Sequence, residues 1–212
     1  MIPRDNQERN SFHFRPGWFL TVGLWLVLLG VFIYKGYDSD LLRMIYAGES
    51  PMAPVWRLIT MLGSSYFLGP LVAVICISLL MKGRGNSALA FVATWATCAL
   101  TVEWLKFLIS RERPPVALLV FAVGKSFPSG HATQSMIVYS YVLGLIFMAC
   151  SQSSSSGSAV PKWRTILSSL IILLPLLVGI SRVWLGAHWP SDVLVGWGLG
   201  LMFSGIALSI RY

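Results

Sequence analysis

Residues 17–34 read GWFLTVGLWLVLLGVFIY, a run without one charged side chain. An α-helix needs about 20 predominantly apolar residues to cross the hydrocarbon core of a bilayer, so this run predicts a membrane-spanning helix. Five further apolar runs predict spans at 58–81, 87–109, 132–150, 165–181 and 193–210. The sequence therefore predicts an all-α fold, an integral membrane bundle of six transmembrane helices.

The composition agrees with a membrane protein. Of the 212 residues, 56% are hydrophobic and 11% are charged, whereas soluble domains have about 45–50% and about 25%. The three cysteines, Cys76, Cys98 and Cys150, all fall inside apolar runs, and we interpret them as small buried residues without a disulfide. The net charge of +8 comes from basic residues dispersed among the loops. A nucleic-acid partner is not expected, because such proteins cluster their basic residues on one face.

The chain is expected to form one membrane-embedded domain over residues 1–212. Residues 1–16 are polar and predict a cytoplasmic tail. Residues 151–164 begin with the Ser/Gly-rich segment SQSSSSGSAVPK and predict a flexible cytoplasmic loop. Residues 38–50, between the first two spans, place apolar residues at helical spacing. They predict an ordinary connecting helix, or one that lies flat in the membrane interface.

The placement of Lys and Arg predicts the orientation in the membrane. With six spans, both termini and the loops at 82–86 and 151–164 lie on one side. Three basic residues lie in the other connecting segments, and five more lie in or beside the polar segments described next: Lys106, Arg111, Arg113, Lys125 and Arg182. The positive-inside rule then places both termini in the cytoplasm and the polar segments outside a bacterial-type inner membrane. The eight basic residues on the cytoplasmic side are Arg4, Arg9, Arg15, Lys82, Arg84, Lys162, Arg164 and Arg211.

Three polar segments reach the outer face of the predicted bundle. They run from Lys106 to Pro114, from Pro128 to His131 and from Ser181 to Asp192. Each segment alone has an ordinary explanation, as a helix start, an interfacial histidine or basic residues that reach the headgroups. A charged side chain at the centre of a span costs about 2.5–3.5 kcal/mol. Three such segments on one face therefore indicate a common functional site.

The cations of these segments indicate an anionic ligand. Lys106, Arg113 and Arg182 supply three positive charges, and the guanidinium fork of arginine matches the oxygens of a phosphate. Ser129 and Gly130 lie where the fourth span begins, so free backbone N–H groups and the positive end of the helix dipole point at the same anion. The sequence therefore predicts a phosphate-binding site at the outer ends of the last four spans.

Two histidines and a carboxylate add chemistry to this site. His188 and Asp192 are four residues apart, so the carboxylate can hydrogen-bond one ring nitrogen and leave the other free to attack phosphorus. His131 comes from another helix and is a candidate general acid for the leaving oxygen. Together these residues predict phosphoryl transfer through a phosphohistidine intermediate.

The three segments follow the pattern K-x-x-x-x-x-x-R-P, then P-S-G-H, then S-R-x-x-x-x-x-H-x-x-x-D. This pattern resembles the three-part signature of the type 2 phosphatidic acid phosphatase superfamily, and the six spans resemble its membrane branch over nearly the whole chain. The resemblance implies a phosphatase that uses no metal and no cofactor. It also implies the roles of the site residues: Lys106, Arg113, Ser129, Gly130 and Arg182 bind phosphate, His188 is the nucleophile, Asp192 supports it and His131 is the acid.

We expect a membrane lipid phosphatase that hydrolyses the terminal phosphate of a lipid phosphate or diphosphate at the extracytoplasmic end of the bundle. The resemblance suggests undecaprenyl diphosphate, which we favour, and phosphatidylglycerol phosphate, phosphatidic acid or lipid A 1-phosphate. One alternative is a phosphotransferase that uses a second lipid as acceptor. Another is a non-catalytic lipid or anion transporter, which the clustering of polar groups at one edge disfavours. The oligomeric state is not predicted.

Three charged residues near the pattern are given minor roles. Arg111 and Lys125 lie outside the pattern and are expected to face solvent or lipid headgroups. Glu103 lies one turn before Lys106, so we expect the two side chains to pair and the carboxylate to fix the direction of the lysine.

Overall fold

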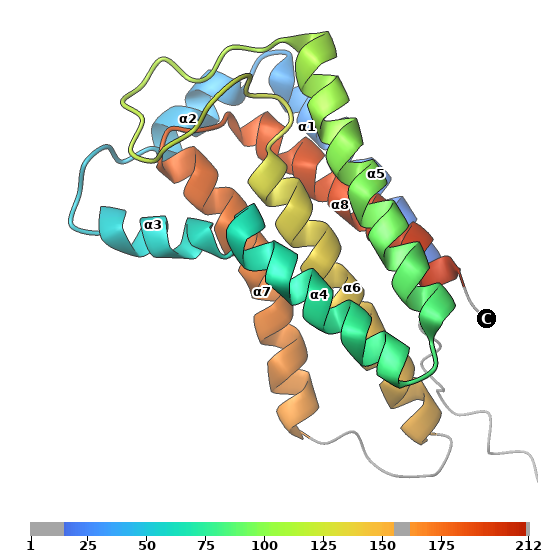
Figure 1. The fold of residues 1–212 in the computed structure, drawn as a ribbon. Helices are drawn as coiled ribbons and strands as arrows, with labels where there is room; N and C mark the ends of the chain where they lie inside the picture. The colour runs from blue at the N-terminus through green and yellow to red at the C-terminus, as the bar shows by residue number, and fades with distance from the viewer. Residues whose placement is uncertain (1–14, 155–161, 211–212) are drawn as a thin grey trace, which may run out of the picture.

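The computed structural model describes residues 15–154 and 162–210, and these residues form helices and no strand. The all-α prediction is therefore confirmed for the described part of the chain. Figure 1 shows the long helices side by side in a bundle. In chain order the helices are α1 (Gly17–Tyr34), α2 (Asp38–Ile45), α3 (Ala53–Met61), α4 (Ser65–Met81), α5 (Gly85–Ile109), α6 (Gly130–Ser154), α7 (Lys162–Trp184) and α8 (Pro190–Ser209).

Five segments of the described chain are long and apolar enough to cross a membrane. They are α1, the pair α3 and α4 together, α5, α7 from Ile166 and α8. The remaining predicted span, 132–150, corresponds to α6, which is not among the five. The structure thus agrees with a multi-pass helical membrane protein, and the count of six spans stays a prediction.

Some predictions concern residues that the structure does not describe. The tail over residues 1–16 is described only from residue 15. α6 continues to Ser154 and α7 begins at Lys162, so the central part of the predicted loop, 155–161, lies outside the described residues. Cys98 is buried, Cys76 is partly buried and both are free thiols.

The second predicted span is divided in the structure. α3 ends at Met61, and Ser64 caps a new helix by accepting a hydrogen bond from the Phe67 N–H (3.4 Å). Gly63 lies in the turn, where a Cβ atom would clash with the Val178 side chain of α7. The turn therefore packs closely against α7, and Figure 1 shows α3 at a steep angle to α4. The sequence predicted a single span over 58–81 because Gly63 and Ser64 carry no charge and do not interrupt the apolar run.

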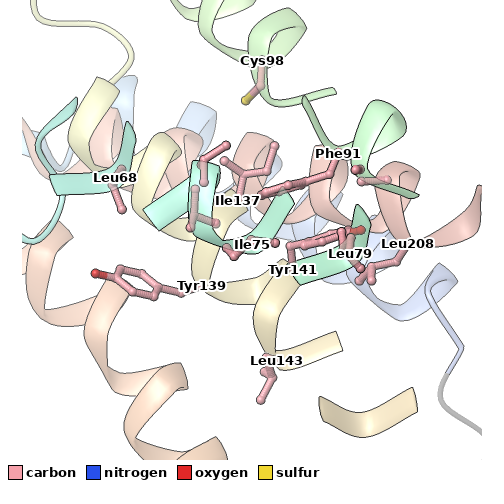
Figure 2. Packing of buried hydrophobic residues seen from close by; sticks show 14 of the residues in the cluster. Leu68, Ile75, Leu79, Phe91, Cys98, Ile137, Tyr139, Tyr141, Leu143 and Leu208 are labelled. Atoms are coloured by element: carbon pink, nitrogen blue, oxygen red, sulfur yellow. The ribbon is translucent and has the colours of Figure 1, made fainter. Parts of the chain in front are cut away.

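α6 is the central helix of the bundle. It packs against α4, α5, α7 and α8, and all of residues 132–141 except Gln134 are buried. On the side of α4 and α5 its contacts form an apolar core, in which the rings of Phe91 and Tyr141 stack with centroids 3.9 Å apart. Figure 2 shows these side chains with their neighbours from α4 and α8. This packing fixes the position of α6, whose first residues carry part of the predicted site.

Small residues allow α8 to approach its neighbours closely. A Cβ atom on Gly198 would lie 2.5 Å from the Gly23 carbonyl oxygen of α1, and one on Gly196 would lie 2.9 Å from the Ser129 carbonyl oxygen. Such separations are possible only for residues without a side chain. Gly196 thereby brings the beginning of α8 against the beginning of α6, which positions the predicted site.

Candidate active site

The three polar segments of the sequence pattern meet at one end of the bundle, where α5 and α7 end and α6 and α8 begin (Figure 1). The Ser129 N–H donates a hydrogen bond to the Asp192 carbonyl oxygen (3.0 Å), which joins the second and third segments. Arg113 Nη1 donates to the Ala187 carbonyl oxygen (2.5 Å), which joins the first and third. These contacts confirm the predicted convergence of the segments.

His188 lies buried beside the carboxylate of Asp192. Its Nδ1 is 3.5 Å from Asp192 Oδ2, at the outer limit of a hydrogen bond, and 3.5 Å from Ser126 Oγ. The Ser126 hydroxyl also donates to Asp192 Oδ2, and the same oxygen accepts the Trp189 N–H (3.0 Å) in the first turn of α8. Because Nδ1 faces the carboxylate, the Nε2 atom of His188 points away from it.

Burial is the largest influence on the ionisation of His188. It lowers the pKa of the imidazole to about 4, because the cation would lose its hydration. The hydrogen bond to Asp192 opposes this shift, while the positive charge of Arg182 adds to it. The ring is therefore neutral at neutral pH, which is the form that a nucleophile requires.

Two buried polar atoms near His188 suit an anionic ligand. Arg182 is 2% exposed, and its Nη1 donates to Thr60 Oγ1 (2.9 Å). Among the described residues, Arg182 Nε and Ser129 Oγ have no hydrogen-bond partner. A buried polar group without a partner costs about 1–3 kcal/mol, so both atoms favour a ligand rich in hydrogen-bond acceptors, such as a phosphate.

Lys106 approaches the same place from α5. A Cβ atom on Gly130 would lie 3.8 Å from Lys106 Nζ, so the ammonium group stands over the first residue of α6. Lys106 Nζ donates to Glu103 Oε1 at 2.7 Å, which confirms the predicted pair. His131 is partly buried and lies within electrostatic range of Lys106 and His188. Lys106 and His188 thus lie near the first residues of α6, Gly130 and His131.

Arg113 uses three of its N–H groups on backbone carbonyl oxygens. Besides Ala187, these belong to Gly124, 3.1 Å from Nε, and Val123, 2.8 Å from Nη2. Each Nη atom carries a second N–H. Arg113 therefore holds the α5–α6 loop against the residue before His188 and keeps two donors for a ligand.

The prediction that Arg111 faces solvent or headgroups is wrong. Its side chain is 13% exposed, and its Nη1 donates to Asp192 Oδ1 (2.7 Å) while its Nη2 donates to Asp38 Oδ2 (2.7 Å). Lys125, in contrast, is 41% exposed and pairs with Glu112 at 2.5 Å, in keeping with its predicted position. The sequence does not distinguish the two cations, because the partners of Arg111 lie 73 and 81 residues away.

Sequence reasoning also missed Asp38, Ser126 and Thr60. Asp38 is 5% exposed, and its Oδ1 accepts the Ser191 N–H (2.9 Å). An acidic residue at the start of a short helix ordinarily indicates an exposed interaction with the helix dipole, so nothing marked Asp38 as part of a site. Ser126 precedes the Pro128–His131 motif by two residues, and Thr60 lies inside an apolar run. Their roles depend on contacts across the bundle.

No metal site was predicted, and the described residues include no group of three or more His, Cys, Asp and Glu side chains that could hold a metal ion.

Known proteins share both the sequence pattern and the fold. A profile of the PAP2 superfamily matches residues 87–212, which include all three polar segments. Phosphatidylglycerophosphatase B of Bacillus subtilis is 34% identical over 144 residues, 68% of each chain. Undecaprenyl-diphosphatase of Sulfolobus acidocaldarius is 27% identical over 200 residues, 91% of this chain and 87% of that protein.

A solved structure is similar over nearly its whole length. The crystal structure of a transmembrane PAP2 type phosphatidylglycerolphosphate phosphatase from Bacillus subtilis aligns with a TM-score of 0.74 at 28% identity. The alignment covers 92% of this chain and 94% of that one. The family match, the identity and the shared fold confirm the resemblance seen in the three segments, and the chain belongs to the PAP2 superfamily.

Proposed function

We propose that the chain is a membrane lipid phosphatase that hydrolyses the terminal phosphate of a lipid phosphate or diphosphate. The proposal is carried by one observation, the buried His188 beside Asp192, at the place where Lys106, Arg113 and Arg182 gather. A neutral nucleophile beside cations matches the needs of phosphoryl transfer, because the cations neutralise the phosphoryl oxygens while the imidazole attacks.

In the proposed reaction, His188 Nε2 forms a bond to phosphorus as the bond from phosphorus to the lipid oxygen breaks. His131 donates a proton to that oxygen, and the dephosphorylated lipid leaves. Water then gives a proton to His131 and attacks the phosphohistidine, which releases inorganic phosphate and restores the imidazole. Asp192 stabilises the positive charge on His188 during the first step, because its carboxylate faces Nδ1.

The phosphate is held by groups from three helices in this proposal. Arg182 Nε and Ser129 Oγ are buried without partners among the described residues. The first N–H groups of α6 have no acceptor within the helix, and Gly130 leaves room for an oxygen beside them. Lys106 Nζ lies over the same residue. The groups proposed to bind the phosphate therefore lie near His131 in the folded protein.

The location of the site supports a substrate that stays in the bilayer. The polar residues lie at one end of the bundle, and the predicted topology places this end on the extracytoplasmic side with both termini in the cytoplasm. A lipid can then keep its tail between apolar surfaces while its headgroup reaches His188.

The two named relatives differ in substrate. One name refers to a glycerophospholipid and the other to a polyprenyl diphosphate, and the shared group is a terminal phosphate on a lipid. The proposal is therefore made for this group, with undecaprenyl diphosphate as the favoured substrate.

The purified protein tests the proposal when it is presented with undecaprenyl diphosphate, phosphatidylglycerol phosphate, phosphatidic acid and lipid A 1-phosphate. We expect inorganic phosphate from at least one lipid, and the ranking of kcat/KM then names the substrate. Phosphate that appears on a second lipid would instead indicate phosphotransfer. Release from none of the four lipids by a folded protein would contradict the proposal.

Replacement of the nucleophile provides the matched control. We expect His188→Ala to abolish phosphate release, because the proposed covalent intermediate forms on His188 Nε2, while the variant still inserts into the membrane. Acid-labile, base-stable labelling of the wild-type protein by a ³²P-labelled substrate would report the phosphohistidine. Normal turnover by His188→Ala would exclude the mechanism.

A further inference from the structure

Arg111 is bound between two buried carboxylates. Its Nη1 donates to Asp192 Oδ1 (2.7 Å) and to Ser191 Oγ (2.8 Å), and its Nη2 donates to Asp38 Oδ2 (2.7 Å). The side chains of Asp38 and Asp192 are 6% and 0% exposed. One guanidinium therefore neutralises part of the charge of two carboxylates that water does not solvate.

Aromatic rings complete the surroundings of Arg111. Its guanidinium carbon lies 4.4 Å from the centroid of the Tyr34 ring and 4.9 Å from that of Trp189. Both distances fall within the range of cation–π attraction. Since α1 ends at Tyr34 and α2 begins at Asp38, the residues around Arg111 join the α1–α2 connection to the beginning of α8.

The carboxylate of Asp192 is held at both oxygens. Oδ1 accepts from Arg111, and Oδ2 accepts from the Ser126 hydroxyl and the Trp189 N–H while it faces His188 Nδ1. A carboxylate with contacts on both oxygens cannot rotate without breaking one of them. The contact at Oδ1 therefore determines how Oδ2 is presented to His188.

We propose that Arg111 is a positioning residue for the reaction, because it keeps Asp192 ionised and directed at His188, and that Asp38 holds Arg111 in this position. The inference rests on the proposed function of the site. It adds a second buried carboxylate, 73 residues from Arg111 in the sequence, to the residues on which turnover depends. Neither Arg111 nor Asp38 belongs to the three-part pattern.

The charges predict an outcome that a purely structural contact would not produce. Removal of Arg111 leaves the buried carboxylates of Asp38 and Asp192 without the cation between them, and the repulsion between the two negative charges then favours the protonated form of Asp192. A protonated Asp192 no longer stabilises a positive His188. Removal of the Asp38 charge in the same variant relieves the repulsion and lets Asp192 ionise again.

The experiment compares Arg111→Gln, Asp38→Asn and the double variant, with the lipid that the wild-type protein hydrolyses best. We expect Arg111→Gln to lower kcat by about 10²-fold, the usual result of a misplaced catalytic group. KM should change by less than about 2-fold, because Arg111 acts on Asp192 and not on the substrate. Asp38→Asn alone should lower kcat by a smaller factor.

In the double variant, Asp38→Asn should raise kcat about 3- to 10-fold above that of Arg111→Gln, a factor typical of residues in direct contact. Asp38→Asn is thus expected to lower kcat in the wild-type protein and to raise kcat in Arg111→Gln. Lys125→Gln removes another cation from the same α5–α6 connection and should leave kcat unchanged. A double variant no faster than Arg111→Gln, or an Arg111→Gln enzyme as fast as the wild type, would overturn the inference.

Folding is controlled separately by size-exclusion chromatography and thermal unfolding in detergent. If Arg111→Gln does not fold, Arg111→Lys is used in its place, because lysine keeps the charge but not the fork that reaches both carboxylates. Its kcat should fall by at least about 10-fold with KM retained, and a normal kcat would overturn the inference. A wild-type protein that releases no phosphate contradicts the proposed function itself, whereas an active wild type with unaffected Arg111 variants contradicts only this inference.

Discussion

At the scale of single residues, His188 illustrates how burial prepares a nucleophile. In water a histidine near pH 6.5 is half protonated, and an imidazolium has no lone pair to attack with. Burial lowers the pKa of His188 to about 4, and Asp192 opposes this shift only in part. The same carboxylate favours the cation once a bond to phosphorus forms. The pair therefore suits both the free and the phosphorylated state of the proposed cycle.

A titration of His188 tests this description. Because its native pKa lies below that of the unfolded chain, the imidazole should stay neutral at pH 6 and take up a proton with a midpoint near pH 4. NMR of protein labelled with ¹⁵N-histidine, free of phosphate, measures the midpoint, and His188→Asn assigns the resonance. A midpoint at or above pH 6.5 would exclude a buried, neutral ring.

The sign of the shift also predicts a change in stability. Above pH 6.5 the ring is neutral in the folded and the unfolded protein, so it adds no dependence on pH. Between pH 6.5 and about 4 only the unfolded chain takes up the proton, and the free energy of unfolding decreases as the pH falls. In His188→Asn this part of the pH dependence should be absent from thermal unfolding curves.

At the scale of helices, the contact between α6 and α8 positions the site. Gly196 lies one turn after Asp192, and a Cβ atom there would come 2.9 Å from the Ser129 carbonyl oxygen and 2.9 Å from Thr133 Oγ1. A backbone oxygen of a central helix cannot move away easily. The hydrogen bond from the Ser129 N–H to the Asp192 carbonyl oxygen therefore depends on a glycine at position 196.

We expect Gly196→Ala to separate the beginnings of α6 and α8 and to lower both activity and stability. Overpacking of a tight helix contact costs about 1–3 kcal/mol, which thermal unfolding in detergent can detect. Gly85→Ala is the matched control, because its Cβ atom would meet only a Leu80 carbon at 3.8 Å. Equal activity and stability in the two variants would show that the α6–α8 contact does not set the geometry of the site.

At the scale of the whole molecule, the bundle gathers residues from four helices at one of its ends. α6 begins at the site, and α5, α7 and α8 bring Lys106, Arg182 and Asp192 beside it, while Arg113 and His188 lie in the connecting segments. The orientation proposed from the positive-inside rule places this end outside the cell. A lipid phosphate exposed at the outer leaflet would then reach the site directly.

Cysteine labelling tests this orientation. We expect Lys125→Cys to react with a membrane-impermeant maleimide added to intact cells, because residue 125 lies on the α5–α6 loop and is partly exposed. Lys82→Cys, in the exposed turn after α4, should react only after lysis. The unsubstituted protein controls for reaction of its own cysteines. The reverse pattern of labelling would invert the topology.

Much of the architecture could be predicted from the sequence. The run 17–34 coincides with α1, and the other long helices begin and end within a few residues of the predicted spans, because apolar length is a local property of the chain. The division of 58–81 at Gly63 and Ser64 was not predicted, since the turn depends on contact with α7. The Glu103–Lys106 pair was predicted because residues one turn apart on a helix are neighbours.

The order and spacing of residues along the chain were enough to predict a helical membrane protein of the PAP2 type, with a cationic site that contains two histidines. Local patterns carry that information, since each segment keeps its residues at a set spacing. The folded bundle was needed to show that Arg111 lies between Asp38 and Asp192 and that Ser126 and Thr60 contact site residues. These pairs join positions that are far apart in the sequence. Which buried groups pair depends on how close the fold brings them, so the pairing leaves no periodic pattern in the sequence.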